Sequence, residues 1–294
     1  MNDLPERGDC GSRVERRRER SLKKAQRRRA TAIAFSVSLI LIVLLGAGGW
    51  VIYRRASARR GPTPRTYAVT LPEGLNATET GERFEEATNG SIKAAEFSRA
   101  LKAGGYDYSF LKGTKGNLEG FLFPNTYQVT STTTARETVD KLLCDFKKET
   151  DDLEWNRAAE LGVTPYQIVI IASLIEKEVK LSTERPLVAS VIYNRLKKNM
   201  KLGMCSTVLY ALGQWKPKLT NKDIEVDSPY NTYKINGLPP GPICNPGFES
   251  IRASLFPATT DYLYFILTGP EGSHSFTSDY RQFDIWKNEQ NKKQ

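Results

Sequence analysis

The sequence is poor in the residues that most metal and nucleophilic sites require. Its 294 residues include one histidine, His274, and four cysteines, and no two cysteines stand in a Cys-x-x-Cys spacing. Structural zinc sites use clustered cysteine and histidine ligands, and a Ser-His-Asp triad needs a histidine beside its nucleophile. We therefore expect neither a metal site nor a triad of this kind.

The sequence also has little net charge outside its N-terminal region. The whole chain carries +10, but residues 1–30 hold 11 Lys and Arg against 5 Asp and Glu, and Arg54 and Arg55 add two more positive charges. Residues 56–294 are therefore nearly neutral. A nucleic-acid-binding domain is usually basic itself, so we expect no nucleic acid among the partners.

The longest uncharged segment, residues 31–53, follows the Arg-rich tail of residues 1–30. About 20 apolar residues in a helix span a bilayer, so we predict a single transmembrane helix here. Trp50 and Tyr53 suit the membrane interface, and the excess of basic residues before the segment predicts a cytoplasmic N-terminus. The expected location is the cell membrane, with the tail in the cytoplasm and everything after residue 55 outside.

A cleaved signal peptide is the alternative for this segment. Residues 56–58, Ala-Ser-Ala, resemble a cleavage site, whereas the long basic tail and long apolar run favour a retained anchor. With this topology Cys144, Cys205 and Cys244 lie outside the cytoplasm, where disulfides persist. Because three is an odd number, at least one of them stays free or pairs between chains.

The remainder divides into a linker, a small module and a larger domain. Residues 54–65 are rich in Arg, Ser, Gly and Pro and read as a linker. A strand at 67–70, helices at about 77–88 and 91–103, and an extended run at 120–129 predict a strand–helix–helix–strand module over 66–130. Residues 131–294 alternate helical patterns with loops and a hairpin at 262–277. The expected fold class is α+β, with a mixed α/β larger domain.

One predicted helix, residues 164–179, is apolar nearly all round and then reaches a carboxylate. Thr164 is a good N-cap and Pro165 a good first helical residue. Such a helix is usually buried, and Glu176 would leave the core at its edge. A carboxyl group in that setting can hold a proton near neutral pH and act as a general acid. The alternative is a solvated helix end, with Glu176 paired to Lys180.

Six segments in the same order resemble the endolytic murein transglycosylases, the YceG-like (MltG) family. The resemblance covers about residues 66–285. Each motif alone is weakly specific, and the ordered set is strong. The segments are Leu118–Pro124, Ile171–Glu178, Val188–Leu196, Ser228–Tyr233, Gly237–Ile243 and Gly272–Phe276.

The resemblance implies a membrane-anchored lytic transglycosylase that needs no cofactor. The 66–130 module would be a LysM-like glycan-binding domain, and residues 131–294 the catalytic domain, with Glu176 as its acid and base. Glu176 would protonate the oxygen of the MurNAc–GlcNAc β-1,4 bond of nascent glycan. It would then take the proton from the C6 hydroxyl that attacks C1, giving a 1,6-anhydro end. The expected partners are peptidoglycan glycan strands and, as a family-level expectation, wall-synthesising glycosyltransferases.

Four other residues in the matched motifs are weaker candidates for substrate binding. Asn231 and Tyr233 could hydrogen-bond the sugar, or Asn231 could simply form a turn. Ser173 lies three residues before Glu176 and could share its face, or bond a local carbonyl. His274 is a further candidate, with a structural role as the alternative.

The sequence departs from the family pattern at its cysteines. Cys205 and Ser206 stand where the family usually has Asp followed by Pro or Ala, and Cys244 stands where a small residue is usual. From this we predict a possible disulfide between Cys205 and Cys244, with Cys144 free. Asn125 also replaces a more usual Asp.

Two other functions stay open from the sequence. A water-using muramidase would need a second carboxylate near Glu176, for which Glu184, Asp223 and Asp227 are candidates. A non-catalytic glycan-binding scaffold would use the anchor and the basic tail instead.

Overall fold

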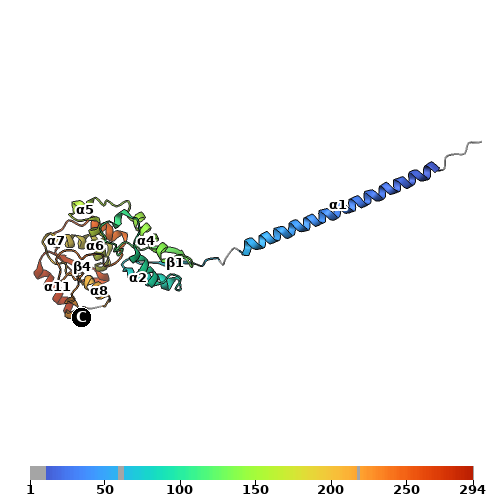
Figure 1. Cartoon of the computed structure of the whole chain (residues 1–294). Coiled ribbons are helices and arrows are strands. Elements are labelled where there is room, and N and C mark those ends of the chain that lie inside the picture. Colours follow the sequence, from blue (N-terminus) through green and yellow to red (C-terminus); the bar gives the residue numbers. More distant parts are fainter. Residues whose placement is uncertain (1–10, 59–62, 217–218, 294) are drawn as a thin grey trace, which may run out of the picture. The chain divides into compact units, whose positions relative to one another are not determined.

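The computed structural model describes residues 11–58, 63–216 and 219–293 and divides the chain into two compact units, Met1–Thr63 and Pro64–Gln294 (Figure 1). In the N-terminal unit, helix α1 (Gly11–Ala58) covers the predicted membrane segment and the described part of the basic tail before it. Its Leu22–Arg55 stretch is the one helix in the described residues that is long and apolar enough to cross a membrane.

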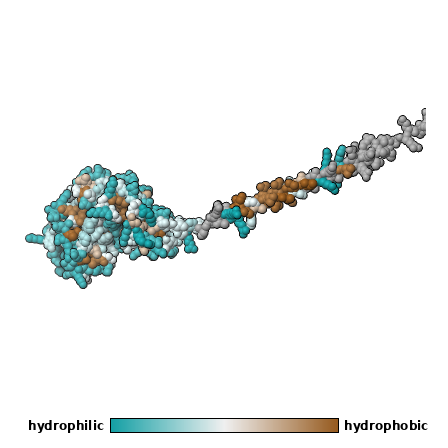
Figure 2. All heavy atoms as spheres, in the orientation of Figure 1, coloured by the Kyte–Doolittle hydropathy of each residue, from teal (hydrophilic) through white to brown (hydrophobic). Residues whose placement is uncertain are grey.

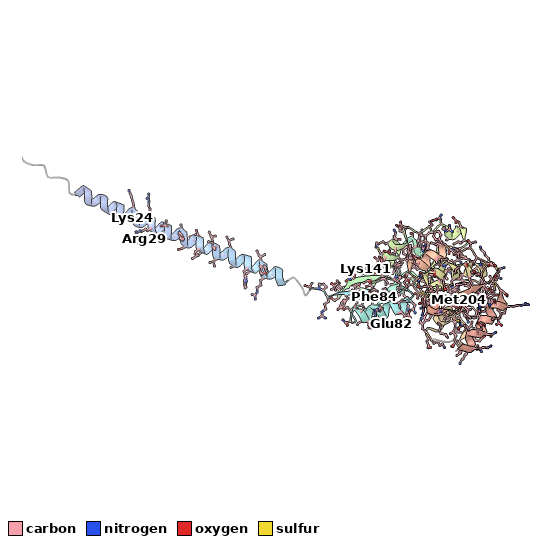
Figure 3. All side chains as sticks on the ribbon, turned by 180° about the vertical axis from the view of Figure 1, so that it is seen from behind. Lys24, Arg29, Glu82, Phe84, Lys141 and Met204 are labelled. Atoms are coloured by element: carbon pink, nitrogen blue, oxygen red, sulfur yellow. The ribbon has the colours of Figure 1, made fainter. Side chains whose placement is uncertain are left out.

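The surface of α1 explains this property. Ile40, Leu44 and Trp50 are exposed, and Figure 2 shows apolar residues over the central part of the helix. Lys24 and Arg29 lie on the basic stretch before it (Figure 3). A helix that exposes apolar side chains in this way and satisfies its own backbone hydrogen bonds suits a membrane interior. The helix is consistent with a membrane anchor or a signal sequence.

The second unit begins with the predicted order strand, helix, helix, strand. Strand β1 (Thr66–Thr70) pairs antiparallel with β2 (Thr126–Thr130), with Thr66 opposite Thr130. Between them lie α2 (Ala77–Ala87) and α3 (Ala94–Ala103), whose Phe84 and Phe97 rings stack at 5.7 Å between centroids. Asn76 starts α2 with a capping box, because its side chain accepts from Thr78 and Glu79.

The segment before β2 differs from the extended run expected at 120–129, because β2 begins only at Thr126. The backbone N–H groups of Gly120 and Leu122 donate instead to Oδ1 of Asn245, at 2.8 and 3.0 Å. Gly120 has φ +92°, and a Cβ there would lie 2.6 Å from Pro242. A buried side-chain amide thus replaces the strand ladder, and the chain folds as a tight buried loop.

The rest of the unit is mostly helical. Among the described residues the only sheets are β1–β2 and an antiparallel hairpin, β3–β4. The α+β class is confirmed, while the larger domain has less strand than a mixed α/β fold implies. The remaining elements are η1 (Ser109–Leu111), α4 (Ala135–Thr150), α5 (Arg157–Glu160), α6 (Pro165–Glu178), η2 (Ser182–Glu184), α7 (Arg185–Lys197), α8 (Cys205–Leu212), α9 (Asn221–Ile224), α10 (Phe248–Leu255), β3 (Tyr264–Leu267), η3 (Pro270–Gly272), β4 (His274–Thr277) and α11 (Tyr280–Lys293).

Helix α6 lies between two apolar cores. Ile168 and Ala172 join a core that also contains Phe84 of α2 and Phe146 of α4. Leu174 of α6 belongs to a second core, formed with apolar residues of α7 and the loops that follow it. The first core contains residues from both sides of position 130, so the 66–130 module and the predicted catalytic domain share it. Their division into two domains at that position stays a prediction.

Glu119, in the loop before β2, is a buried acid with a stabilising set of donors. Both of its oxygens accept from the N–H of Ala77 at the start of α2, at 3.0 and 3.1 Å, and Tyr210 of α8 donates at 3.4 Å. Burial nevertheless raises the pKa of its carboxyl to about 7, against these hydrogen bonds. The folded state therefore binds the Glu119 proton more tightly than the unfolded chain does.

This difference predicts a pH-dependent stability. The pKa of Glu119 is higher in the folded state than in the unfolded chain. Its contribution to stability is therefore complete at pH values below the unfolded-state pKa and is lost as pH rises through about 7. Between pH 5 and pH 8 we expect Glu119 to account for a loss of about 2.5 kcal/mol in the free energy of unfolding. Denaturant titrations of the wild type and Glu119→Gln at both pH values check this, because the variant should show a much flatter dependence. Parallel pH profiles would contradict it.

Candidate active site

Helix α6 begins and ends as the sequence predicts. Thr164 and Gln167 form a capping box, with Pro165 in the first turn. Residues 168–175 are all buried, and the helix ends at Glu178. Burial on every side excludes charge along this stretch, so Glu176 is the first carboxylate that α6 carries as it leaves the cores.

The Glu176 carboxyl group is held by donors from two other helices. Its side chain is 7% exposed. Its Oε2 accepts from the Ser250 hydroxyl at 2.7 Å and from the N–H of Gly247 at 3.0 Å, at the start of α10. Its Oε1 lies 3.5 Å from Nη2 of Arg185, the first residue of α7. Among the described residues its ion-pair partner is therefore Arg185 and not Lys180, which argues against a solvated helix end.

A second carboxylate, Glu73, shares the same arginine. Nη2 of Arg185 lies 3.4 Å from Oε2 of Glu73, and Nε of Arg185 donates to the Ser250 hydroxyl oxygen at 3.0 Å. The carboxyl groups of Glu73 and Glu176 are therefore neighbours at one nitrogen of Arg185. Burial and the neighbouring charge of Glu176 raise the pKa of Glu73, and the charge of Arg185 opposes them.

Glu73 comes from the turn after β1, and hydrogen bonds attach this turn to α6 and to Asn245. The N–H of Gly74 donates to the carbonyl of Asn245 at 3.0 Å, and Lys177 of α6 donates to the carbonyl of Gly74 at 3.2 Å. Gly74 has φ +83°, a conformation that favours glycine. Gly247 has no side chain where Glu73 packs, since a Cβ there would lie 1.8 Å from Oε1 of Glu73.

Two of the predicted substrate-binding residues are fully buried with their polar atoms engaged. The Ser173 hydroxyl donates to the carbonyl of Ile170 at 2.7 Å and accepts from the N–H of Ile243 at 3.1 Å. The Asn231 amide donates to the carbonyls of Ile224 and Val226 at 2.7 and 2.8 Å, and its Oδ1 accepts from the N–H of Tyr233. Both side chains therefore organise the loops in this structure.

The other two are paired with neighbours outside the Glu176 cluster. The Tyr233 hydroxyl lies 3.1 Å from Sγ of Cys205. His274 Nδ1 lies 2.7 Å from Oε2 of Glu184, and the His274 N–H donates to the other oxygen at 2.8 Å. Glu184, a candidate second carboxylate, is thus paired with His274. Asp223, another candidate, is paired with Lys216 at 2.6 Å.

Glu178, two residues after the candidate acid, has its own partners. The Ser206 hydroxyl donates to Oε1 of Glu178 at 2.6 Å. Burial raises the pKa of the Glu178 carboxyl, opposed by this hydrogen bond and by the nearby charge of Arg195. Glu178 thus stabilises the loop at the start of α8, and it is not the freely solvated residue that its position near a helix end implies.

The expected disulfide between Cys205 and Cys244 is absent. Both residues carry free thiols, as does Cys144. Cys244 is buried, and its Sγ donates to the carbonyl of Ser173 at 3.4 Å, whereas Cys205 is exposed and faces Tyr233. The two thiols have separate partners, so the loop that carries Cys244 is held by hydrogen bonds to α6.

Three residues of the Glu176 cluster are not predicted from the sequence: Glu73, Arg185 and Ser250. Glu73 stands in a Pro-Glu-Gly turn, which predicts only a change of chain direction. Arg185 and Ser250 lie near predicted helix starts, where polar residues are ordinary. No spacing relates the three, since their proximity arises only from the packing of β1, α7 and α10 around the end of α6.

Two cavities lined by described residues lie away from Glu176. One of about 600 Å³ opens at the start of α6, lined by Phe110, Trp155 and Tyr166 among others. Another of about 510 Å³ lies beside Glu119 and Tyr210. Ten residues of helix rise separate Tyr166 from Glu176, about 15 Å, so the first cavity is remote from the candidate acid.

Known proteins resemble this chain over most of its length. Residues 53–289 match the model of the YceG-like family. An endolytic murein transglycosylase of Bacillus subtilis (strain 168) is 38% identical over 236 residues, which are 76% of this chain and 64% of that protein. One from Streptococcus pneumoniae (strain ATCC BAA-255 / R6) is 29% identical over 244 residues, 75% of this chain and 44% of that protein.

A solved structure extends the comparison to the fold. The crystal structure of a yceG-like protein from Listeria monocytogenes matches with a TM-score of 0.67 and 30% sequence identity. The match covers 81% of this chain and 80% of that one. The chain thus spans most of the solved structure, but less than two thirds of the length of the two transglycosylases it resembles.

The donors around Glu176 lead to a stability prediction. Ser250→Ala removes the hydroxyl between Glu176 and Arg185 and leaves a nearly buried carboxylate short of a donor. We expect the free energy of unfolding to fall by about 1.5–3 kcal/mol, the usual cost for a hydrogen bond to a charged group. Ser254→Ala is the matched control, because this equally buried α10 serine bonds only the Ile251 carbonyl of its own helix. Equal losses in denaturant titrations would contradict the assignment.

Proposed function

Because this chain belongs to the YceG-like family, we propose that it is a membrane-anchored endolytic peptidoglycan transglycosylase. It cleaves the MurNAc–GlcNAc β-1,4 bond of nascent glycan and leaves 1,6-anhydro-MurNAc ends, which limits strand length in wall assembly. The observation that carries the proposal is the Glu176 carboxyl, set at the end of buried helix α6 among the donors Ser250, Gly247 and Arg185.

The hydrogen bonds distinguish the two oxygens of Glu176. Oε2 accepts from Ser250 and Gly247 at 2.7 and 3.0 Å, whereas Oε1 has only the 3.5 Å contact with Arg185. The less engaged oxygen, Oε1, is the better carrier of a transferable proton. Protonated Glu176 would give this proton to the glycosidic oxygen as the bond from C1 breaks.

The second half of the reaction returns the proton. The C6 hydroxyl of the same MurNAc attacks C1, and its proton passes to the Glu176 carboxylate. Since this attack is intramolecular, its effective concentration is high, and the protein mainly positions and protonates. The glycan supplies the nucleophile and Glu176 the acid and base, so no step in this scheme calls for a cofactor.

The contact between Glu73 and Glu176 favours this reaction over hydrolysis. A muramidase places a second carboxylate across the sugar ring, about 5–9.5 Å from the first. Glu73 and Glu176 both lie against the same nitrogen, Nη2 of Arg185, at 3.4 and 3.5 Å, so the two carboxyl groups flank a guanidinium group and not a sugar ring. Of the other candidates, Glu184 is paired with His274 and Asp223 with Lys216.

The remaining predicted roles follow from the same proposal. We propose that the 66–130 module is LysM-like and binds glycan, and that the half-buried Tyr233 contacts the sugar. The buried side chains of Ser173 and Asn231, and the pair of His274 with Glu184, support the loops that shape the site. A scaffold without catalysis would not need an acid held as Glu176 is, although wall-synthesising glycosyltransferases remain proposed partners.

The proposed location rests on α1. We propose that α1 is retained as a single-pass anchor in the cell membrane, with the basic residues before it in the cytoplasm and the catalytic domain outside. Intact-mass measurement of the protein extracted from membranes should then give the full 33.0 kDa. A mature chain that starts near residue 59 would show that the segment is a signal peptide.

The central experiment is product analysis with purified uncrosslinked glycan. Glu176→Gln should lower cleavage by about 100- to 10,000-fold, because the amide cannot donate or accept the catalytic proton. Mass spectrometry of the wild-type products should show ends one water lighter than reducing ends. Glu154→Gln, an exposed carboxylate in the loop before α5, is the control and should behave as wild type. Reducing ends would contradict the transglycosylase, and undiminished cleavage by Glu176→Gln would exclude this residue as the acid.

A further inference from the structure

We propose that Glu73, from the turn after β1, is a positioning residue that acts through Glu176 by sharing one proton with it. The strand–helix–helix–strand module would then complete the active site as well as bind glycan. This inference rests on the proposed function, because it concerns the acid of that reaction.

The first support is the balance of charge around the two carboxyl groups. Nη2 of a single cation, Arg185, lies 3.4 Å from Glu73 and 3.5 Å from Glu176, and both carboxyl groups lie against Gly247. Two ionised carboxylates would leave a net negative charge beside the nearly buried side chains of Glu176 and Arg185. One shared proton makes the cluster neutral, as in other pairs of carboxyl groups in contact.

The other charged groups that face Glu73 do not supply a second cation. Glu249 of α10 is a further acid and acts on Glu73 in the same direction as Glu176. Lys177 of α6 donates to the carbonyl of Gly74 and lies 3.6 Å from the Trp215 ring centroid, so it is directed to the backbone of the turn. The raised pKa of Glu73, caused first by burial and then by Glu176, agrees with this arrangement.

The second support is that the contact is built into the backbone. The Glu73 side chain is 46% exposed, so burial alone does not hold it in place. The turn is instead fixed by the bonds from Gly74 to Asn245 and from Lys177 to Gly74. The absence of a side chain at Gly247 leaves the space that the Glu73 carboxyl occupies.

The shared proton gives Glu73 a defined part in turnover. In the resting enzyme the proton lies between the two carboxyl groups. Glu176 passes it to the glycosidic oxygen, which leaves both groups ionised beside Arg185. The proton that leaves the C6 hydroxyl then returns to Glu176, and the pair again holds one proton. Glu73 thus holds a share of the proton until the acid is needed, and no proton is gained or lost overall.

The test is the pH dependence of glycan cleavage by the full chain. Glu73→Gln keeps a hydrogen-bond donor to Glu176 but removes the negative charge beside it. The alkaline limb of the kcat profile should therefore move to lower pH by about one unit or more, with KM little changed. Glu73→Asp, which keeps the charge, should return the alkaline limb part of the way to its wild-type pH. An alkaline limb that does not move in Glu73→Gln would overturn the proposal.

Two further variants separate this role from a structural one. Gly247→Ala places a methyl group where the Glu73 carboxyl packs but keeps the N–H that donates to Glu176. It should therefore move the alkaline limb to lower pH, as Glu73→Gln does. Glu154→Gln, an exposed carboxylate in the loop before α5, removes an acid away from the cluster, and the limb should stay in place. A uniform loss of activity at every pH in Glu73→Gln and Gly247→Ala would mean that Glu73 only supports the turn. The mass of the product tests the reaction and the pH limb tests Glu73, so the two proposals can fail separately.

Discussion

The burial of helix α6 is the constraint on which the rest of the structure depends. Eight consecutive residues of this helix, 168–175, are buried, and its opposite faces belong to two different apolar cores. Burying each large aliphatic side chain contributes about 1.5–3 kcal/mol, so the position of α6 is firmly determined. Glu176 follows this stretch directly. Its carboxyl group is therefore carried on a rigid element, which a catalytic acid requires.

The segments that complete the site are attached to α6 by buried polar side chains. Ser173 holds the loop before Asn245, and Asn245 in turn holds the backbone of Gly120, Leu122 and Leu75. A buried amide bonded in this way is costly to disrupt, because each partner would lose its only compensation for burial. Through these bonds the module and the loop before α10 are positioned against the same helix end. The site is thus one continuous construction, although its residues are far apart in the sequence.

The electrostatics of this helix end fit an acid that must both give and take a proton. Ser250 and Gly247 donate to Glu176 and Arg185 lies beside it, while Glu73 brings a second carboxyl group to the same arginine. Donors generally favour the base form of a carboxyl group and a neighbouring carboxyl group its acid form, and the proposed reaction needs both forms in turn. The balance between donors and a neighbouring carboxyl group gives the module a chemical part in the site. It also explains why Glu73 and Gly247 pack so closely.

The sequence by itself determined the apolar helix α1, the family, the α+β class, the limits of α6 and the candidate acid, because periodicity, caps and ordered motifs are local. It did not determine the loop at Gly120, the free thiols of Cys205 and Cys244, or the cluster of Glu73, Arg185 and Ser250. It equally left open whether the Ser173 and Asn231 side chains face substrate or backbone, and the structure places both against backbone groups. Only the tertiary structure decided these contacts. Hydrogen bonds between segments as many as 171 residues apart, as from Gly74 to Asn245, depend on packing that no local pattern records.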